Sequence, residues 1–227
     1  MLHTGIAWRH PPLELGFGSG STCYRRMVEW QEAGVWERLH ALLLSELRAA
    51  GEIDWSRAVA TPVMCRRKGG SATGPSPVDR ARNGSKHHLL VDASGIPLAW
   101  AVTGGNRNDV TQMIPLVDRV PPVRGRVGRP RRRPDRLTAD RGYDHDTYRR
   151  ELRQRGIASE IAHRQTEHGS GLGRVRWVVA RAFAWLRHFK RLLVRYGRRH
   201  EIHDAFLALG CCLVCFRRLR RSLDSSA

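Results

Sequence analysis

The sequence has little lysine and few acidic residues. Lys and Arg together number 40 of the 227 residues, Asp and Glu only 21, and the formal net charge is +19. Lysine occurs only at Lys68, Lys86 and Lys190, so 37 of the 40 basic residues are arginine. The planar guanidinium of arginine binds phosphate through two parallel hydrogen bonds, which the ammonium of lysine cannot do. This composition indicates nucleic acid as the partner.

Long hydrophobic runs are also absent. The longest apolar run, Ala205–Phe216, has 12 residues, whereas a membrane-spanning helix needs about 20. Arg9 and His10 lie close to Met1, and no apolar segment of the secretory kind follows them. We therefore expect no membrane span and a cytoplasmic, nucleoid-associated protein.

Cysteine is scarce and odd in number. Three of the five cysteines, Cys211, Cys212 and Cys215, lie in the apolar stretch FLALGCCLVCF. Their neighbours are Leu, Val and Phe rather than the polar groups that orient metal ligands. The stretch therefore favours reduced thiols packed in a core over a metal site.

Hydrophobic periodicity divides the rest of the chain into helices and short strands. Gly34 divides a helical stretch over 24–50 into two helices. Further helices are predicted over 108–120, 146–155, 175–195 and 202–223, and strands over 58–66, 86–92, 97–103, 136–140 and 158–162. This succession predicts an α/β fold with one mixed sheet.

The segment PPVRGRVGRPRRRP, residues 121–134, contains six arginines, four prolines and two glycines. Proline and glycine prevent regular structure, and the arginines repel one another. We predict a mobile basic loop.

The octet ADRGYDHD contains the sharpest local signal, because Asp140 ends a predicted strand. Side chains at strand ends line the crevice in which α/β sheets bind ligands. A carboxylate there can bind Mg²⁺, although an acid in this position can also cap a helix. The octet alone leaves both readings open.

Several longer blocks of the chain resemble one family, the insertion-sequence-five transposases of the insertion-sequence-four superfamily. The blocks are TGIAWRHPPLELGFGSGSTCYRRMVEWQEAGVW, GEIDWSRA, KGGSATGPSPVDRARNGSKHHLLVDASGIPLAWAVTGGNRND, RLTADRGYD and RVRWVVARAFAWLRHFKRLLVRYGRRHEIHDAFLALGCCLVCFRRL. The resemblance implies a ribonuclease-H-like mixed sheet flanked by helices. It divides the chain into a residual N-terminal helical segment, 1–52, and a catalytic domain, 53–223, that includes the basic loop.

The resemblance also implies a DDE site, in which two aspartates and a glutamate bind two Mg²⁺ or Mn²⁺ ions that cut and rejoin DNA. The second aspartate corresponds to Asp140, the expected metal ligand of this chain. Thr61 occupies the place of the first aspartate. Ala180 occupies that of the glutamate, since this chain reads RWVVARAFAWL where the family has RWVVERTFAWL. We therefore expect a catalytically impaired copy with weakened metal binding.

Further acids and histidines lie in or near these blocks. Asp92, Asp109 and Asp144 are acids that could replace the lost ligands. His87 and His88 are not expected to form a metal pair, because adjacent strand residues point to opposite faces. Only three residues precede TGIAWRHPP, so we also expect an N-terminally truncated member of the family.

Double-stranded DNA, as element ends and target, is the expected partner, with a homodimer as the candidate assembly. The residues expected to contact DNA are Arg174, Arg176, Arg181, Arg187 and Lys190 of the predicted helix and Arg131, Arg132 and Arg133 of the basic loop. The aromatic residues of the same helix, Trp177, Phe183, Trp185 and Phe189, recur at helical period and are expected in the core.

Three functions compete for this sequence. The first is an insertion-sequence transposase, and the second is a non-catalytic DNA-binding remnant or domesticated protein. The third is a basic RNA-binding protein, for which the chain lacks the aromatic sheet pattern of RNA-binding modules. Terminal inverted repeats in the flanking DNA would separate the first function from the second.

Overall fold

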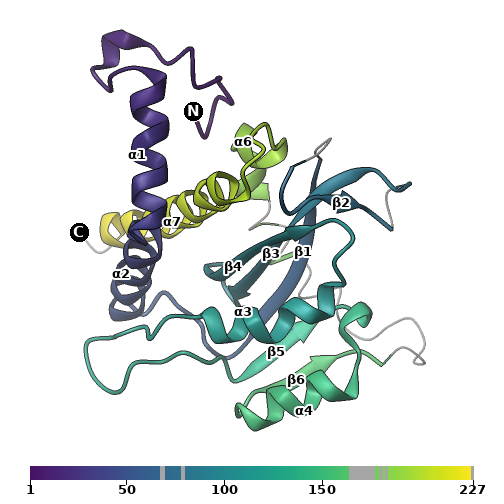
Figure 1. The fold of residues 1–227 in the computed structure, drawn as a ribbon. Helices are drawn as coiled ribbons and strands as arrows, with labels where there is room; N and C mark the ends of the chain where they lie inside the picture. Colours follow the sequence, from purple (N-terminus) through teal and green to yellow (C-terminus); the bar gives the residue numbers. More distant parts are fainter. Residues whose placement is uncertain (67–69, 78–79, 164–176, 179–180, 182–183, 226–227) are drawn as a thin grey trace.

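A computed structural model describes residues 1–66, 70–77, 80–163, 177–178, 181 and 184–225 (Figure 1). Its centre is a mixed sheet of β1 (Ala58–Arg66), β2 (Gly74–Pro75), β3 (Asn83–Asp92), β4 (Pro97–Gly104), β5 (Arg136–Ala139) and β6 (Ala158–Ile161). Strand β3 pairs antiparallel with β1 and β4, and the short β2 pairs with its first residues. Strand β5 runs parallel to β1 and β6. The predicted mixed sheet is confirmed.

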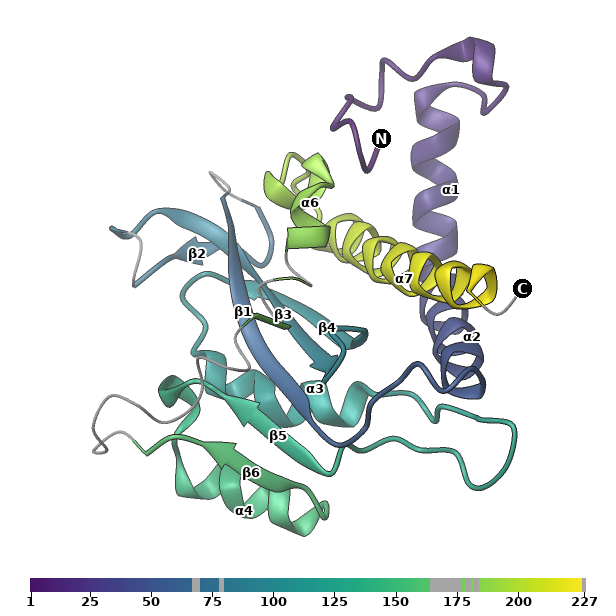
Figure 2. The same ribbon diagram turned by 180° about the vertical axis from the view of Figure 1, so that it is seen from behind.

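Helices flank the sheet on both faces (Figures 1 and 2). They are α1 (Gly20–Glu32), α2 (Val35–Ala49), α3 (Met113–Arg119), α4 (Asp146–Gln154), α6 (Lys190–Leu193) and α7 (His200–Asp224), with 3-10 turns η1 (Leu13–Leu15), η2 (Asp109–Gln112) and η3 (Arg141–Tyr143). Alternate residues of β3 enter two hydrophobic clusters. Leu90 packs with residues of α3 in one, whereas Leu89 and Val91 pack with residues of α6 and α7 in the other. None of the described helices is both long and apolar enough to cross a membrane.

Local signals explain the two N-terminal helices. Helix α1 starts after Ser19, whose Oγ accepts a hydrogen bond from the N–H of Thr22 at 3.3 Å. Gly34 adopts a left-handed backbone, φ 64°, between α1 and α2, a conformation that glycine reaches without steric cost. The predicted break at Gly34 is confirmed.

The single helix predicted over 175–195 is wrong in its second half. Residues 184–187 are helical, but Phe189 has an extended backbone, φ −89° and ψ 103°, and α6 follows it as a separate short helix. The N–H of Lys190 donates to the carbonyl of His3 at 3.3 Å. In a continuous helix the N–H of Lys190 would donate to a carbonyl of the preceding turn. Here the carbonyl of His3 accepts this hydrogen bond instead, and the helix is interrupted at Phe189.

The basic loop 121–134, predicted to be mobile, is tied to the rest of the fold at its base. Val123 and Arg131 form a β-bridge, and the guanidinium of Arg48 in α2 donates to the carbonyls of Val123 and Arg129. The tip is solvent-exposed, with Val127 88% exposed. The loop therefore forms an anchored, extended hairpin beside α2 (Figure 1).

Strand β1 changes its pairing midway. It pairs with β5 only at Ala58 and Val59, whereas its pairing with β3 continues to Arg66. Pro62, which lies past that point, has no N–H to donate, and proline is tolerated where a strand lacks a partner on one side. The two strands therefore separate just where the residues expected in the DDE site begin.

Candidate active site

Asp140 lies directly after β5 and is exposed to solvent. Its carboxylate accepts a hydrogen bond from the N–H of Gly142 at 2.8 Å, which makes Asp140 the N-cap of η3. Asp140 therefore caps a 3-10 turn and not α4, the helix predicted over 146–155. A carboxylate has about four acceptor sites, so this bond leaves most of its oxygen surface available to a cation.

The register of the sheet relates Thr61 to Asp140. Ala58 pairs with Leu137 and Val59 with Thr138, where the pairing ends; the same register carried on for two residues would match Thr61 with Asp140. Neighbours in parallel register point to one face of a sheet. Thr61 is partly exposed, as a residue beside a site must be.

The third expected member of the site, Ala180, lies outside the described residues, as do Arg174, Arg176 and Phe183. Neighbours of Ala180 are described on each side. Val178 is buried in the cluster that contains Leu89, and the guanidinium of Arg181 donates to the carbonyl of Ser94 at 2.5 Å. The convergence of Ala180 with Thr61 and Asp140 stays a prediction.

Asp92, one of the acids that could replace a lost ligand, is buried at the end of β3. Its carboxylate accepts hydrogen bonds from the N–H groups of Asp54, Ser94 and Ile96 at 2.9, 3.0 and 2.7 Å. Burial raises the pKa of Asp92 to about 7, although these hydrogen bonds oppose the rise. Asp92 thus organises the β3–β4 turn and does not face the site.

Asp144, the second of these acids, is committed to an ion pair. It lies 2.6 Å from the guanidinium of Arg149, and their side chains are only 13% and 15% exposed. The same guanidinium donates to the carbonyl of Ile161 and so ties α4 to β6. Removing either partner would leave a buried charge unpaired.

Asp109 is the third acid and the one with a connection to Asp140. It lies 2.8 Å from Nζ of Lys86. The phenol of Tyr143 is buried beside it, and burial, followed by the charges of Asp109 and Asp140, raises the pKa of Tyr143 well above its usual value. Tyr143 therefore stays protonated between two carboxylates. The sequence analysis missed Tyr143 and Lys86, because no spacing signal links the RGYD motif to a lysine far upstream.

The expected DNA-contacting residues of the basic loop are engaged within the protein. Arg131 pairs with Asp135, and its guanidinium lies 5.4 Å from the ring centre of Trp55. Arg132 donates to the carbonyl of Val120 at 3.3 Å, and Arg133 to that of Arg155 at 2.8 Å. These residues shape the base of the loop, and three further exposed arginines, Arg124, Arg126 and Arg129, lie between the two residues of its β-bridge.

The second expected DNA-contacting group lies elsewhere. Arg187 and Lys190 are exposed, and both views show α6 near the start of α7 and the basic loop well apart from it, beside α2 (Figures 1 and 2). The described residues of the second group therefore do not lie beside the loop.

The aromatic residues near α6 divide in their burial. Phe189 is buried and Trp185 is partly buried, which confirms the predicted core role. Trp177, in contrast, is 54% exposed, and the guanidinium of Arg181 lies 4.7 Å from its ring centre. The predicted core role is wrong for Trp177.

Taken together, the described residues expected in or near the site are the exposed carboxylate of Asp140, the partly exposed hydroxyl of Thr61 and the buried phenol of Tyr143. Divalent ions that act on phosphate need several ionic oxygen ligands to hold them. Thr61 supplies only a neutral hydroxyl, and Asp92 and Asp144 are committed elsewhere.

Comparison with known proteins yields two family matches. The model described as Transposase DDE domain matches residues 53–215, and the model described as Putative transposase of IS4/5 family matches residues 1–40. The first match spans the whole sheet and most of α7.

Two proteins of Burkholderia cepacia are similar to the chain. The first, the putative transposase for insertion sequence element IS402, is 60% identical over 160 residues, which cover 70% of this chain and 76% of the relative. The second, the insertion element IS402 uncharacterized 16.2 kDa protein, is 53% identical over 78 residues, which cover 34% of this chain and 53% of that protein.

Proposed function

Because the chain belongs to the DDE transposase family and is an insertion-sequence transposase, we propose that this copy binds DNA but no longer cuts and rejoins it. The mixed sheet with flanking helices is the ribonuclease-H-like fold of that family. Enzymes of the family cleave and transfer DNA strands with divalent metal ions. The proposal concerns what the substitutions at Thr61 and Ala180 have done to that activity.

The register between β1 and β5 carries the proposal. If Thr61 lies opposite Asp140, a neutral hydroxyl stands where the family has an ionic ligand. The aspartate and the glutamate that are missing would together contribute two negative charges to a site for two dications. The described residues therefore do not fit a two-metal centre.

Mg²⁺ or Mn²⁺ is the ion that we propose for the intact form of the site. Carboxylates are hard oxygen ligands, and hard ligands select these ions over softer ones. In the present chain Asp140 alone would bind such an ion weakly, because one carboxylate leaves most of its charge uncompensated.

Double-stranded DNA, as element ends and target, is the partner that we propose. The net charge of +19 and the exposed arginines at the loop tip support this assignment, since phosphate contacts supply most of the sequence-independent affinity for DNA. A protein bound to chromosomal DNA in this way would be associated with the nucleoid. A domesticated DNA-binding protein, the alternative function, would bind DNA through the same surface and would differ only in its role in the cell.

Restoring the two acids tests the loss of activity. We expect the unmodified chain to bind Mn²⁺ too weakly for calorimetry and to leave duplexes that end in the inverted repeats of its element uncut. The double variant Thr61→Asp with Ala180→Glu should gain Mn²⁺ binding. Ala180→Glu alone should gain little, because the ligand from β1 would still be missing.

A triple variant that adds Asp140→Ala is the matched control, and it should lose the regained Mn²⁺ binding. Metal-dependent cleavage by the unmodified chain that disappears in Asp140→Ala would overturn the proposal. Such a result would mean that another acid completes the site.

A further inference from the structure

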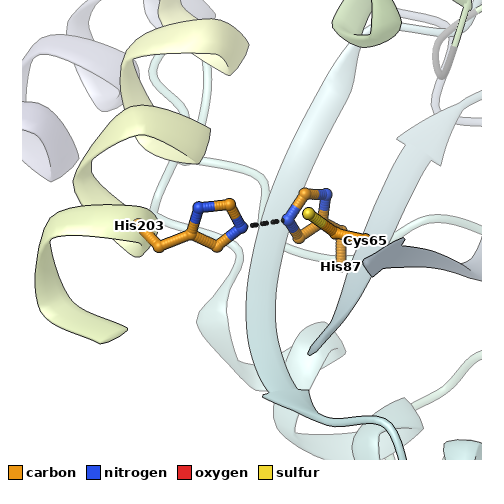
Figure 3. Close-up of side chains that lie close together, drawn as sticks. All are labelled: Cys65, His87 and His203. Atoms are coloured by element: carbon orange, nitrogen blue, oxygen red, sulfur yellow. Dashed lines mark hydrogen bonds between the residues drawn. The ribbon is translucent and has the colours of Figure 1, made fainter. Parts of the chain in front are cut away.

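Three buried side chains from separate parts of the sequence meet between the sheet and α7. Cys65 comes from β1, His87 from β3 and His203 from α7, and the ligand atoms that they offer all lie within 4.8 Å of one another. Figure 3 shows the two imidazoles facing each other through Nε2, with the sulfur of Cys65 beside the ring of His87. Sulfur and imidazole nitrogen are the ligands that zinc prefers.

The sheet register explains how the first two residues meet. Val63 pairs with His87 and Cys65 with Ser85, so Cys65 and His87 are diagonal neighbours on one face. That face packs against α7, and His203 lies in its first turn. His88 points to the other face, where its Nε2 lies 2.8 Å from Oγ1 of Thr103. The prediction that His87 and His88 are not a pair is confirmed, and His87 has a partner on α7 instead.

The two imidazoles meet through their Nε2 atoms, the atoms that would bind a metal ion. Their Nε2 atoms lie 2.6 Å apart, so one ring donates the proton that the other accepts. Burial, followed by the charges of His88 and Arg195, lowers the pKa of His87 to about 3. A neutral imidazole is the form that coordinates a metal ion.

We propose that Cys65, His87 and His203 form a zinc site that fastens the start of α7 to the sheet. Zinc binds nitrogen at about 2.0 Å and thiolate sulfur at about 2.3 Å in tetrahedral geometry. Two nitrogen ligands of one such ion lie roughly 3.3 Å apart. The two Nε2 atoms, now 2.6 Å apart, would therefore have to separate by less than about 1 Å. A water molecule or the carbonyl of Leu193 would complete the coordination.

The proton balance of the binding step is defined. The thiol of Cys65, which now donates toward the carbonyl of Leu193 at 3.6 Å, must lose its proton to become the thiolate ligand. The ring that donates from Nε2 must move that proton to Nδ1, which changes the tautomer and releases nothing. One proton therefore leaves for each zinc ion that binds.

Arg195 is the charged neighbour that modifies the site. Its buried guanidinium donates to Oγ of Ser85 at 2.6 Å and acts on His87. The positive charge of Arg195 stabilises the thiolate of Cys65 but repels the zinc ion. We therefore expect the affinity for zinc to be lower than that of a site with two thiolate ligands. The three ligand atoms nevertheless lie close enough together for one ion to bind them all.

The proposed zinc site is separate from the DDE site. Cys65 follows Thr61 by four residues on the same strand, which corresponds to about 13 Å at 3.3 Å per residue. All three ligands are buried, so DNA cannot reach the ion. Its role is to stabilise the packing of α7 and not to cut DNA.

Cobalt is the probe for this site, because a thiolate ligand gives Co²⁺ a sulfur-to-metal charge-transfer band. We expect the tag-free, metal-free, reduced chain with Cys23→Ser to bind Co²⁺ with this band and with the visible bands of four-coordinate cobalt. Zn²⁺ should displace the cobalt, and calorimetry in buffers of different ionisation enthalpy should show one proton released per ion.

Substitutions identify the ligands. Cys65→Ser should abolish the charge-transfer band, and His203→Gln should weaken Co²⁺ binding by at least the roughly 10- to 100-fold that outer-shell changes cost. Cys212→Ser is the matched control: Cys212 is also buried and donates to the carbonyl of Trp36 at 3.6 Å, so its variant should keep the band. A band that persists in Cys65→Ser would overturn the proposal.

X-ray absorption of the zinc-loaded parent chain needs no variant and remains decisive if a substitution prevents folding. One sulfur and two imidazoles around zinc support the site. A shell of oxygen and nitrogen alone, or failure of the folded chain to take up Zn²⁺, would show that the cluster is an ordinary buried hydrogen bond.

Discussion

Two aspartates of the sheet, Asp92 and Asp140, have opposite surroundings. Asp92 is buried and receives three backbone N–H groups, whereas Asp140 is exposed and receives one. Both end a strand in the sequence, so the sequence pattern alone does not separate them. The difference arises because Asp92 precedes a tight turn whose N–H groups need an acceptor, and this need is visible only once the turn is built.

At the same scale, His40 couples folding to pH. Its Nε2 lies 2.8 Å from the carbonyl of Pro97, and burial lowers the pKa of His40 from 6.5 to about 4. Between these values the unfolded chain binds a proton that the folded chain does not. The stability that His40 contributes is therefore present above pH 6.5 and is lost as the pH falls toward 4.

His40→Gln tests this coupling, because glutamine can still donate to the carbonyl of Pro97. Urea unfolding measures the free energy of unfolding at pH 7.5 and at pH 5.0. The fall in this free energy between the two pH values should be about 2 kcal/mol smaller in the variant than in the unmodified chain. His10→Gln changes an exposed histidine and should leave the loss unchanged. Equal losses in all three proteins would rule out His40 as a source of the pH dependence.

Helices and strands with a strong hydrophobic periodicity could be predicted from the sequence. Elements that depend on contacts with residues far away in the sequence could not. Strand β1 forms over the predicted range 58–66, and the β3–β4 hairpin and α7 lie within two or three residues of their predicted ends. Strand β2 has only two residues, too few to show a period. The interruption before α6 depends on His3, a partner that no local pattern identifies.

The basic loop shows the same limit and leads to a prediction. Its prolines and glycines indicate irregular structure, but they do not reveal that Arg48 of α2 donates to two of its carbonyls. Hydrogen bonds to a charged group contribute about 1.5 kcal/mol or more each. We expect Arg48→Ala to speed tryptic cleavage after Arg126 at least tenfold, because the loss of even one such bond corresponds to roughly that factor in the closed population.

Arg38→Ala is the control for this experiment. Arg38 also lies on α2, but it donates to Ala33 at the start of the helix and is remote from the loop. Cleavage after Arg126 should proceed at the parent rate in this variant. If Arg48→Ala were cleaved no faster than Arg38→Ala, the loop would be held by something other than Arg48.

For the whole molecule, the sign and size of the charge were predictable and its distribution was not. The sequence indicates two basic segments, and both fit a DNA surface. The basic loop and α6 lie well apart (Figures 1 and 2). The loop leads into β5, which pairs with the start of β1, whereas α6 packs near the other end of β1. Strand order depends on long-range pairing that periodicity does not encode.

DNA binding should therefore depend steeply on salt and draw on more than one surface. We expect the affinity for a duplex of arbitrary sequence to fall with salt, with a log–log slope of about −0.9 per phosphate contacted. Alanine at Arg124, Arg126 and Arg129 together should reduce the magnitude of the slope by roughly one for each arginine that contacts phosphate. Fluorescence anisotropy over a salt series measures both.

Arg25→Ala is the comparison for the loop variant, since Arg25 is exposed but lies near Glu29 on α1. It should change the slope less than the loop substitutions do. An affinity that does not vary with salt, or no binding at low salt, would argue against phosphate contacts as its source.

The hydrogen bonds from Lys190 and Arg191 to the carbonyls of His3 and Leu2 join the two extremes of the chain, and this has a consequence for the order of folding. During synthesis the first residues leave the ribosome long before the segment that they interrupt exists. While the later segment emerges, its own periodicity favours an unbroken helix, and closing a loop of nearly the full chain length is the slowest kind of contact to make. The break before α6 is therefore one of the last features to form, and the N-terminal residues act on a helix that has already begun to assemble.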